Sequence, residues 1–186
     1  MMAAMPERYE QAGQLDLVGS GPLQPFKALR KVLDDGDIIT IVAHDNLEKT
    51  TVDGFEEKGT FYKVIHYEVP SEVLDTLISR SSSCYQSLSY ECKQSLLFDT
   101  TVPDYGKFSP YGWWVSGHNQ TMDYWAGSSP GSRQCSCGLT GTCHDPYKGC
   151  NCDSLHQGWL HDTGNITHME HLPVMALYFG DTGTPI

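Results

Sequence analysis

Hydrophobic and polar positions change their spacing along the chain, and each spacing predicts a different element. Residues 1–14 are polar and have no period, so we expect a tail, with the folded domain spanning residues 15–186. Residues 38–42 form a mostly apolar run, broken only by Thr40, between turn sequences, which predicts a buried strand. Residues 59–69 alternate imperfectly and residues 88–92 alternate strictly between apolar and polar, which predicts two further strands.

A helix of about ten residues is predicted to begin at residues 70–71. Its apolar positions fall on one face at helical spacing: Val73, Leu74, Leu77 and Ile78. Ser71 has the side chain of an N-cap, which satisfies a backbone N–H of the first turn.

The periodic pattern fades after residue 102. Gly, Asp, aromatic residues and Cys dominate residues 103–186, and only 113–115 and 173–179 have the look of strands. We therefore expect an α+β fold. Residues 15–102 form a mixed sheet with one main helix, and residues 103–186 form a loop-rich half that disulfides hold together.

Composition narrows the class of protein. The 186 residues are 39% hydrophobic and 19% charged, with a formal net charge of −11. A chain this acidic repels nucleic acid and anionic lipid, so neither is expected as a partner, and no apolar run predicts insertion into a membrane. Residues 1–8 lack the basic start and apolar core of a signal peptide, so an extracellular domain would be a piece of a larger protein.

The cysteines are concentrated in the second half of the chain. They are Cys84, Cys92, Cys135, Cys137, Cys143, Cys150 and Cys152. Zinc modules usually use C-x2-C pairs, whereas the pairs here are C-x-C with His144 as an extra candidate ligand, so disulfides are favoured over a metal site. An odd number leaves one thiol free or bonded outside this chain.

A disulfide between Cys84 and Cys92 is expected across the intervening loop, although spacing does not fix the connectivity of the remaining cysteines. Two N-glycosylation sequons begin at Asn119 and Asn165. Together with the dense cysteines, these sequons favour a secretory route.

Motifs for catalysis are weak, and we expect no enzyme. Asp162 and Asp181 each begin an Asp-Thr-Gly triplet of the aspartic-protease type, but too few residues surround the triplets to house two lobes. Both triplets are interpreted as turns. His161, His168 and His171 match no metal spacing and are interpreted as surface side chains.

The second half resembles one family. The string that carries the resemblance runs Trp113-Trp114-Val115, Asn119, Tyr124-Trp125-x-Gly127-x-x-Pro130-Gly131, Cys135-x-Cys137-Gly138-Leu139, Cys143-x-Asp145, Cys150-Asn151-Cys152-Asp153, Trp159, Asp162 and His171-Leu172-Pro173-Val174. This order is similar to the fibrinogen-like domain of contactin-associated, neurexin-like cell-adhesion proteins. The family's cysteine after the opening strand is absent from residues 26–30, and the aspartate-rich Ca²⁺ loop of fibrinogen-like lectins has no match, so neither Ca²⁺ nor another cofactor is expected.

The resemblance implies an extracellular recognition module that binds a cell-surface or extracellular-matrix protein. A glycan-binding, lectin-like domain and a structural spacer are the alternatives. Trp113, Trp114 and Trp125 are expected in the core. The loops at 145–148 and 153–158 are the candidate contact regions, with Asp145, Tyr147 and Asp153 as candidate binding residues.

Overall fold

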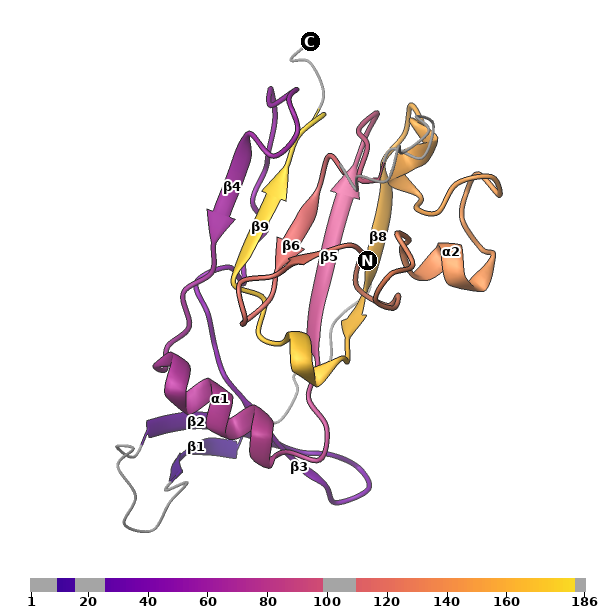
Figure 1. Ribbon diagram of the computed structural model, residues 1–186. Coiled ribbons are helices and arrows are strands. Elements are labelled where there is room, and N and C mark those ends of the chain that lie inside the picture. The colour runs from indigo at the N-terminus through magenta and orange to yellow at the C-terminus, as the bar shows by residue number, and fades with distance from the viewer. Residues whose placement is uncertain (1–9, 16–25, 99–109, 183–186) are drawn as a thin grey trace. The chain divides into compact units, whose positions relative to one another are not determined.

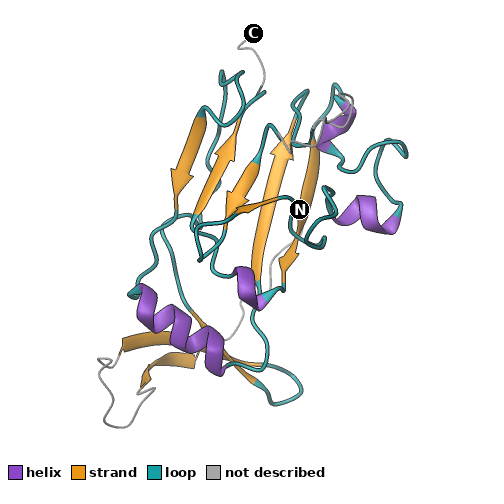
Figure 2. Cartoon of the chain, in the orientation of Figure 1, coloured by secondary structure: helices purple, strands orange, loops and turns teal. Residues whose placement is uncertain are grey.

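A computed structural model describes residues 10–15, 26–98 and 110–182 (Figures 1 and 2). Strands predominate and the helices are short, which fits the expected α+β class. No helix in this part of the chain has the length and apolar character needed to cross a membrane. The elements are β1 Glu10–Leu15, β2 Phe26–Val32, β3 Ile38–Ile41, β4 Phe61–Val64, α1 Ser71–Arg80, β5 Gln86–Cys92, β6 Trp113–Val115, β7 Thr121–Met122, α2 Ser136–Thr140, η1 Cys152–Ser154, β8 Leu160–Ile166, η2 Met169–His171 and β9 Ala176–Phe179.

The chain divides into two compact units. The first contains Met1–Glu48 and His66–Arg80, and the second contains Lys49–Ile65 and Ser81–Ile186. The predicted boundary at residues 102–103 lies outside the described residues. Residues 16–25 and the whole of 99–109 also lie outside them.

The first unit packs α1 on a three-stranded antiparallel sheet of order β1-β2-β3. The predicted helix is confirmed. Ser71 was predicted as its N-cap, but Ser71 is the first helical residue, and the carbonyl of Pro70 accepts the N–H of Val73. On the apolar face of the helix, Val73 and Leu74 are buried, whereas Leu77 and Ile78 are half-buried. The core consists of Val69, Val73 and Leu74, with Phe26, Val42, Tyr67 and Leu77 packed against them.

Two expectations for the first unit are wrong. β1 occupies residues 10–15, so the predicted tail at 1–14 includes most of a strand. β3 is not a buried strand, because Ile38 is 53% exposed. It is an outer strand of its sheet, and alternate residues of a strand face opposite sides.

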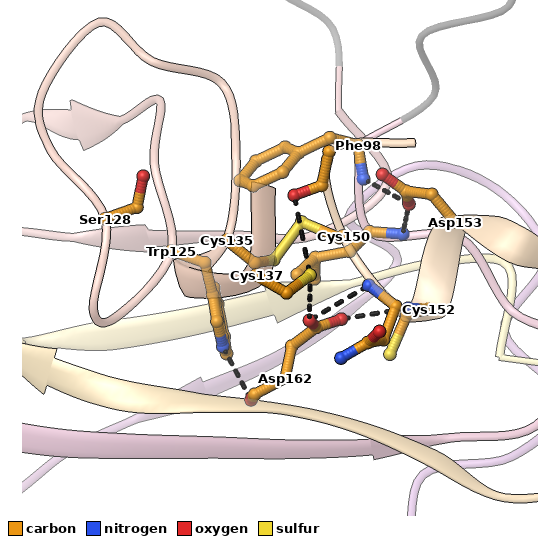
Figure 3. The surroundings of a disulfide bond; sticks show 12 residues. Phe98, Trp125, Ser128, Cys135, Cys137, Cys150, Cys152, Asp153 and Asp162 are labelled. Atoms are coloured by element: carbon orange, nitrogen blue, oxygen red, sulfur yellow. Dashed lines mark hydrogen bonds between the residues drawn. A yellow bond between two sulfur atoms is a disulfide. The ribbon is translucent and has the colours of Figure 1, made fainter. Parts of the chain in front are cut away.

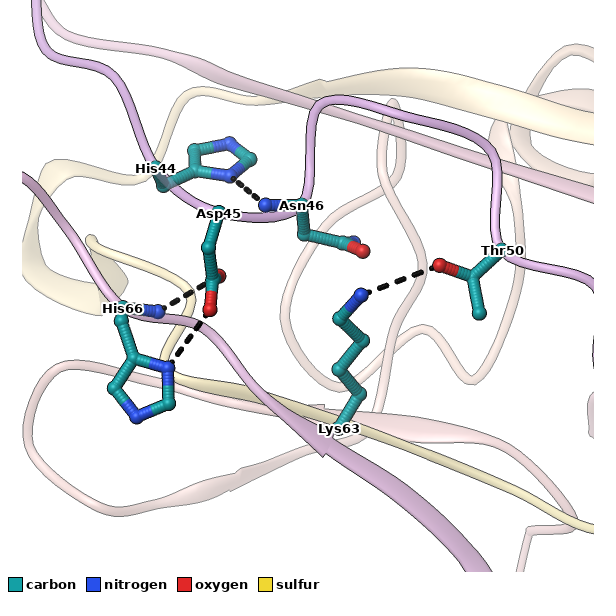
Figure 4. Close-up of polar contacts among 6 residues, drawn as sticks. All are labelled: His44, Asp45, Asn46, Thr50, Lys63 and His66. Carbon is teal, nitrogen blue, oxygen red and sulfur yellow. Dashed lines mark hydrogen bonds and ion pairs between the residues drawn. The ribbon is translucent and has the colours of Figure 1, made fainter.

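A clasp between Asp45 and His66 joins the two stretches of the first unit (Figure 4). The N–H of His66 donates to Asp45 Oδ1 at 3.0 Å, and His66 Nδ1 lies 2.8 Å from Asp45 Oδ2. The backbone N–H of Asp45 donates in return to the carbonyl of His66. Beside the clasp, burial lowers the pKa of His44, an effect that the Asp45 carboxylate partly opposes.

The second unit holds a four-stranded sheet of order β4-β9-β6-β7 and a ladder of seven residue pairs between β5 and β8. Every pairing among the described strands is antiparallel, so the expected mixed sheet is wrong here. Parallel pairing needs a long crossover, usually a helix, and α1 connects strands of different sheets. Lys63 of β4 is tethered by donating to the Thr50 hydroxyl (Figure 4).

Tryptophans form the centre of the second unit, as expected. Trp114 and Trp125 are almost fully buried, and each indole N–H has a partner: Trp114 donates to the carbonyl of Tyr124 and Trp125 to that of Asp162. Satisfied donors allow these large rings to be buried at little electrostatic cost. Trp113 differs, since it is half-buried and stacks on Tyr178 with ring centres 5.0 Å apart.

The interpretation of the first Asp-Thr-Gly triplet as a turn is wrong, because the triplet is part of strand β8. Residues 162–164 lie in the middle of this strand. Gly164 is needed for packing, because a Cβ there would lie 2.5 Å from the carbonyl oxygen of Ala126. The glycine therefore lets β8 approach the Tyr124–Gly127 segment closely. The second triplet ends at residue 183, outside the described residues.

Candidate functional site

Three disulfides organise the cysteine-rich region. They bond six of the seven cysteines, which leaves those sulfurs unable to act as zinc thiolates. Among the described residues, one group of side chains has metal-ligand proximity, Cys135, Cys150 and Asp162, but its two sulfurs are bonded to each other. The bonds are Cys92–Cys152, Cys135–Cys150 and Cys137–Cys143.

The expected bond between Cys84 and Cys92 is wrong, and Cys84 is a free thiol. The reason is that β5 occupies Gln86–Cys92. An extended strand rises about 3.3 Å per residue, so its length alone separates the two cysteines far beyond the ~7 Å that a disulfide tolerates between Cα atoms.

The first loop of the candidate site spans residues 144–149. Its flanking cysteines, Cys143 and Cys150, are bonded to Cys137 and Cys135, which lie at the start of α2. Both ends of the loop are therefore tied to one short segment. The Cys135–Cys150 bond lies in the interior of this region (Figure 3).

The second loop spans residues 153–159, and both of its ends are held to the same residue, Cys92. Cys152, before the loop, is bonded to Cys92 of β5, and Leu160, after the loop, pairs with the same Cys92 across the β5–β8 ladder. A covalent bond and a strand pairing thus hold its two ends together.

Asp162 and Asn151 brace the junction between the two loops. Figure 3 shows the Asp162 carboxylate beside Cys152. The Asp162 carboxylate accepts the backbone N–H groups of Asn151 at 3.0 Å and Cys152 at 2.9 Å. Asn151 accepts the N–H of His144 and donates to the carbonyl of His161. Burial raises the pKa of Asp162, and the two backbone hydrogen bonds oppose that rise. The aspartate therefore has a structural role.

Large apolar side chains protrude from both loops. Tyr147 is 93% exposed and Trp159 is 68% exposed, with Lys49 Nζ 5.8 Å from the Trp159 ring. Leu155 is also exposed, and its backbone has a left-handed φ of 52°, which is unusual for a bulky side chain. We call loops 144–149 and 153–159 together the paired-loop surface.

A contact between two histidines brings the loops of this surface together. His144 and His156 lie with ring centres 4.5 Å apart. The two candidate contact regions predicted from sequence, 145–148 and 153–158, are thus neighbours in space. The predicted region 153–158 includes Leu155 and His156, and Trp159 is part of the string that carries the family resemblance. The exposure of Trp159 and the contact between His144 and His156 were not predicted.

The three candidate binding residues occupy different environments. Tyr147 stands in solvent, and Asp145 is half-buried, with its Oδ1 accepting the N–H of Tyr147 at 2.9 Å. Asp153 is only 1% exposed, so its prediction as a surface contact is wrong. Its Oδ1 accepts the N–H groups of Leu97 and Phe98, a fixed structural task.

The other predicted sites lie elsewhere. Asn119 and Asn165 are exposed, and the Asn165 side chain accepts a hydrogen bond from the Ser87 hydroxyl; glycosylation at both stays a prediction. His161 is exposed as expected. His171 is not a simple surface residue, because its Nδ1 lies 2.9 Å from the Tyr124 hydroxyl, and His168 packs edge-on against the same ring.

The buried carboxyl of Asp153 predicts a dependence of stability on pH. Burial raises its pKa to about 7, and its hydrogen bonds from Leu97 and Phe98 only partly offset that rise. Its Oδ2 has no hydrogen-bond partner among the described residues. Because the folded-state pKa exceeds the unfolded value, this group's contribution to stability is complete below pH about 4 and is lost as pH rises to about 7.

We therefore expect Asp153→Asn to flatten the pH profile. Between pH 5 and pH 8, the wild-type free energy of unfolding is expected to fall by about 2–3 kcal/mol more than that of the variant. Chemical denaturation at both pH values measures this difference, with Glu72→Gln on α1 as the control. Identical pH profiles for wild type and Asp153→Asn would show that Asp153 is not the group responsible.

The structure belongs to the class of predominantly β proteins that are braced by disulfides. It displays two loops whose ends are held together. No protein-family model matches the chain. The chain is 51% identical over 172 residues, 92% of its length, to Neurexin-4 of Drosophila melanogaster. It is 35% identical over 176 residues, 94% of its length, to Contactin-associated protein 1 of Rattus norvegicus.

Identity at these levels over nearly the whole chain makes segments of both proteins its homologues, which supports the resemblance to the contactin-associated, neurexin-like group. The chain spans about an eighth of these relatives, 13% of Neurexin-4 and 12% of Contactin-associated protein 1. Similarity therefore concerns one segment of each.

Proposed function

We propose that this chain is a fibrinogen-like, extracellular recognition module of a cell-surface adhesion protein and that it binds a protein partner. Homology to segments of Neurexin-4 and Contactin-associated protein 1 supports the adhesion class. The disulfides support an oxidising, extracellular setting, since such bonds persist mainly there.

The observation that carries the proposal is the paired-loop surface. Loops closed at their bases lose little conformational entropy on binding, and exposed aromatic rings supply contact area from few rotatable bonds. Tyr147 and Trp159 meet both conditions. Arginine and aromatic side chains are common at the centres of protein interfaces, and the net charge of −11 favours partners with basic contact residues.

A glycan-binding function is the second candidate. The same exposed rings favour it, because a sugar ring can stack on the free face of Trp159 or Tyr147. An array that includes acetylated sugars distinguishes the two functions: binding to one sugar class without protein capture supports the lectin function, and capture of a protein without sugar binding supports adhesion.

The test compares two exposed tyrosines of the second unit. Tyr147 lies on the paired-loop surface, whereas Tyr85, 59% exposed, precedes β5. We expect Tyr147→Ala to reduce binding of the domain to cell-surface extracts by about tenfold or more, the scale of an interface hot spot, while Tyr85→Ala binds normally. The melting temperature is expected to stay nearly unchanged in both variants, because neither ring is buried.

Equal binding by Tyr147→Ala and wild type would overturn the assignment of the paired-loop surface. Loss of binding in Tyr85→Ala but not in Tyr147→Ala would move the contact to another part of the second unit. Absence of any captured protein or sugar would favour the structural spacer.

A further inference from the structure

Two imidazole rings meet where the loops of the paired-loop surface touch. His144 follows Cys143 directly, and His156 lies four positions after Cys152, so disulfides fix the chain near both side chains. Their ring centres are 4.5 Å apart with an interplanar angle of 65°. Both side chains are exposed, so rotation about their side-chain bonds can turn a nitrogen of each ring toward a common point.

Hydrogen bonds position the backbone and one ring of this pair. Asn151 Oδ1 accepts the N–H of His144 at 2.8 Å, which ties His144 to the brace around Asp162. The N–H of Gly158 donates to His156 Nδ1 at 3.0 Å. Because Nδ1 accepts this hydrogen bond, it is the unprotonated nitrogen of the neutral His156 ring, and its lone pair is the one that a cation would take.

We propose that His144 and His156 form a binding site for a divalent late first-row cation of the copper or nickel type. With metal–nitrogen distances of about 2.0–2.1 Å, each ring centre would lie about 3.2 Å from the ion. Centres 4.5 Å apart then subtend about 90° at the ion. That angle suits neighbouring positions in square-planar or octahedral coordination.

The donor chemistry sets the selectivity of the site. Imidazole nitrogen suits copper, nickel and zinc, whereas Ca²⁺ and Mg²⁺ prefer oxygen ligands. Coordination through His156 Nδ1 would leave the single proton of the neutral ring on Nε2. The Gly158 N–H then loses its acceptor, so its amide reports on binding independently of any function.

A bound ion would cross-link the two loops. The first loop carries Tyr147 and the second carries Leu155 and Trp159, so the ion would hold the exposed side chains of the paired-loop surface in one arrangement. Metal binding at this site does not rest on the proposed recognition function, because it requires only the two histidines.

Calorimetric titration of the oxidised chain with Ni²⁺ tests the proposal. Ni²⁺ is chosen because, unlike Cu²⁺, it does not oxidise the free thiol of Cys84. We expect saturation at one ion per chain and no heat from Ca²⁺. Outer-shell changes alone alter metal affinity by about 10–100-fold, so His144→Ala and His156→Ala are each expected to weaken binding by about tenfold or more.

The matched control is His118→Ala, which removes an exposed histidine in the turn between β6 and β7. It is expected to bind Ni²⁺ as wild type does. In the wild type, Ni²⁺ should also broaden or shift the amide resonance of Gly158. Unchanged affinity in His144→Ala or His156→Ala, or an equal loss in His118→Ala, overturns the proposal.

Discussion

Trp125→Ala is expected to destabilise the domain by about 3–5 kcal/mol, the usual effect of truncating a buried tryptophan. The ring is 1% exposed and packs edge-on against Tyr90 and Phe179. Its removal also leaves the carbonyl of Asp162 without the indole N–H. Since small domains are stable by about 5–15 kcal/mol, a loss of this size is expected to unfold a measurable fraction of the molecules at 37 °C.

Trp159→Ala is the control, because it removes the same side chain from the surface. Trp159 is exposed and its contact is with Lys49, so we expect a change within about 1 kcal/mol. Thermal melts of both variants, followed by near-ultraviolet circular dichroism, measure the difference. Similar melting temperatures for the two variants would mean that core and surface are assigned the wrong way round.

Removing the Cys92–Cys152 disulfide is expected to produce the second large loss. The bond closes 60 residues, so the chain-entropy model gives about 4 kcal/mol. Removing Cys137–Cys143, which closes 6 residues, should lose about 2 kcal/mol. Paired serine substitutions, made in a Cys84→Ser background to prevent exchange with the free thiol, compare the two bonds by chemical denaturation.

The disulfide at Cys92 also closes the second loop, so its loss should weaken partner binding as well as stability. Non-reducing peptide mapping of the starting protein is the necessary companion measurement. A bond between Cys84 and Cys92 in that map, or a larger loss on removing Cys137–Cys143, would contradict the connectivity described above.

Elements with a local signal were predictable from sequence. Helix α1 follows from the spacing of its apolar face, and β5 follows from strict alternation. Trp114 and Trp125 were expected in the core because large aromatic side chains dominate small cores, although the exposed Trp159 shows that size alone does not decide burial. For α1 and β5 the information lies within about ten neighbouring residues, so no tertiary knowledge is needed.

Features that depend on distant residues were missed. β8 carries an Asp-Thr-Gly triplet that has the composition of a turn, and only its pairing with β5 and the approach to Ala126 explain it. The partner of Cys92 lies 60 residues away, beyond any spacing rule. Asp153 was predicted to be an exposed loop residue, because its neighbours in sequence do not indicate that the N–H groups of Leu97 and Phe98 donate to its carboxylate.

The most direct test of the paired-loop surface places a photo-crosslinking amino acid at position 147 and, in a matched protein, at position 85. Both native tyrosines are exposed, and only Tyr147 belongs to the paired-loop surface. Each protein is bound to intact cells and irradiated. We predict a discrete cross-linked cell-surface protein from position 147 and none from position 85. Cross-linking at position 85 without cross-linking at position 147 would contradict recognition through the paired loops.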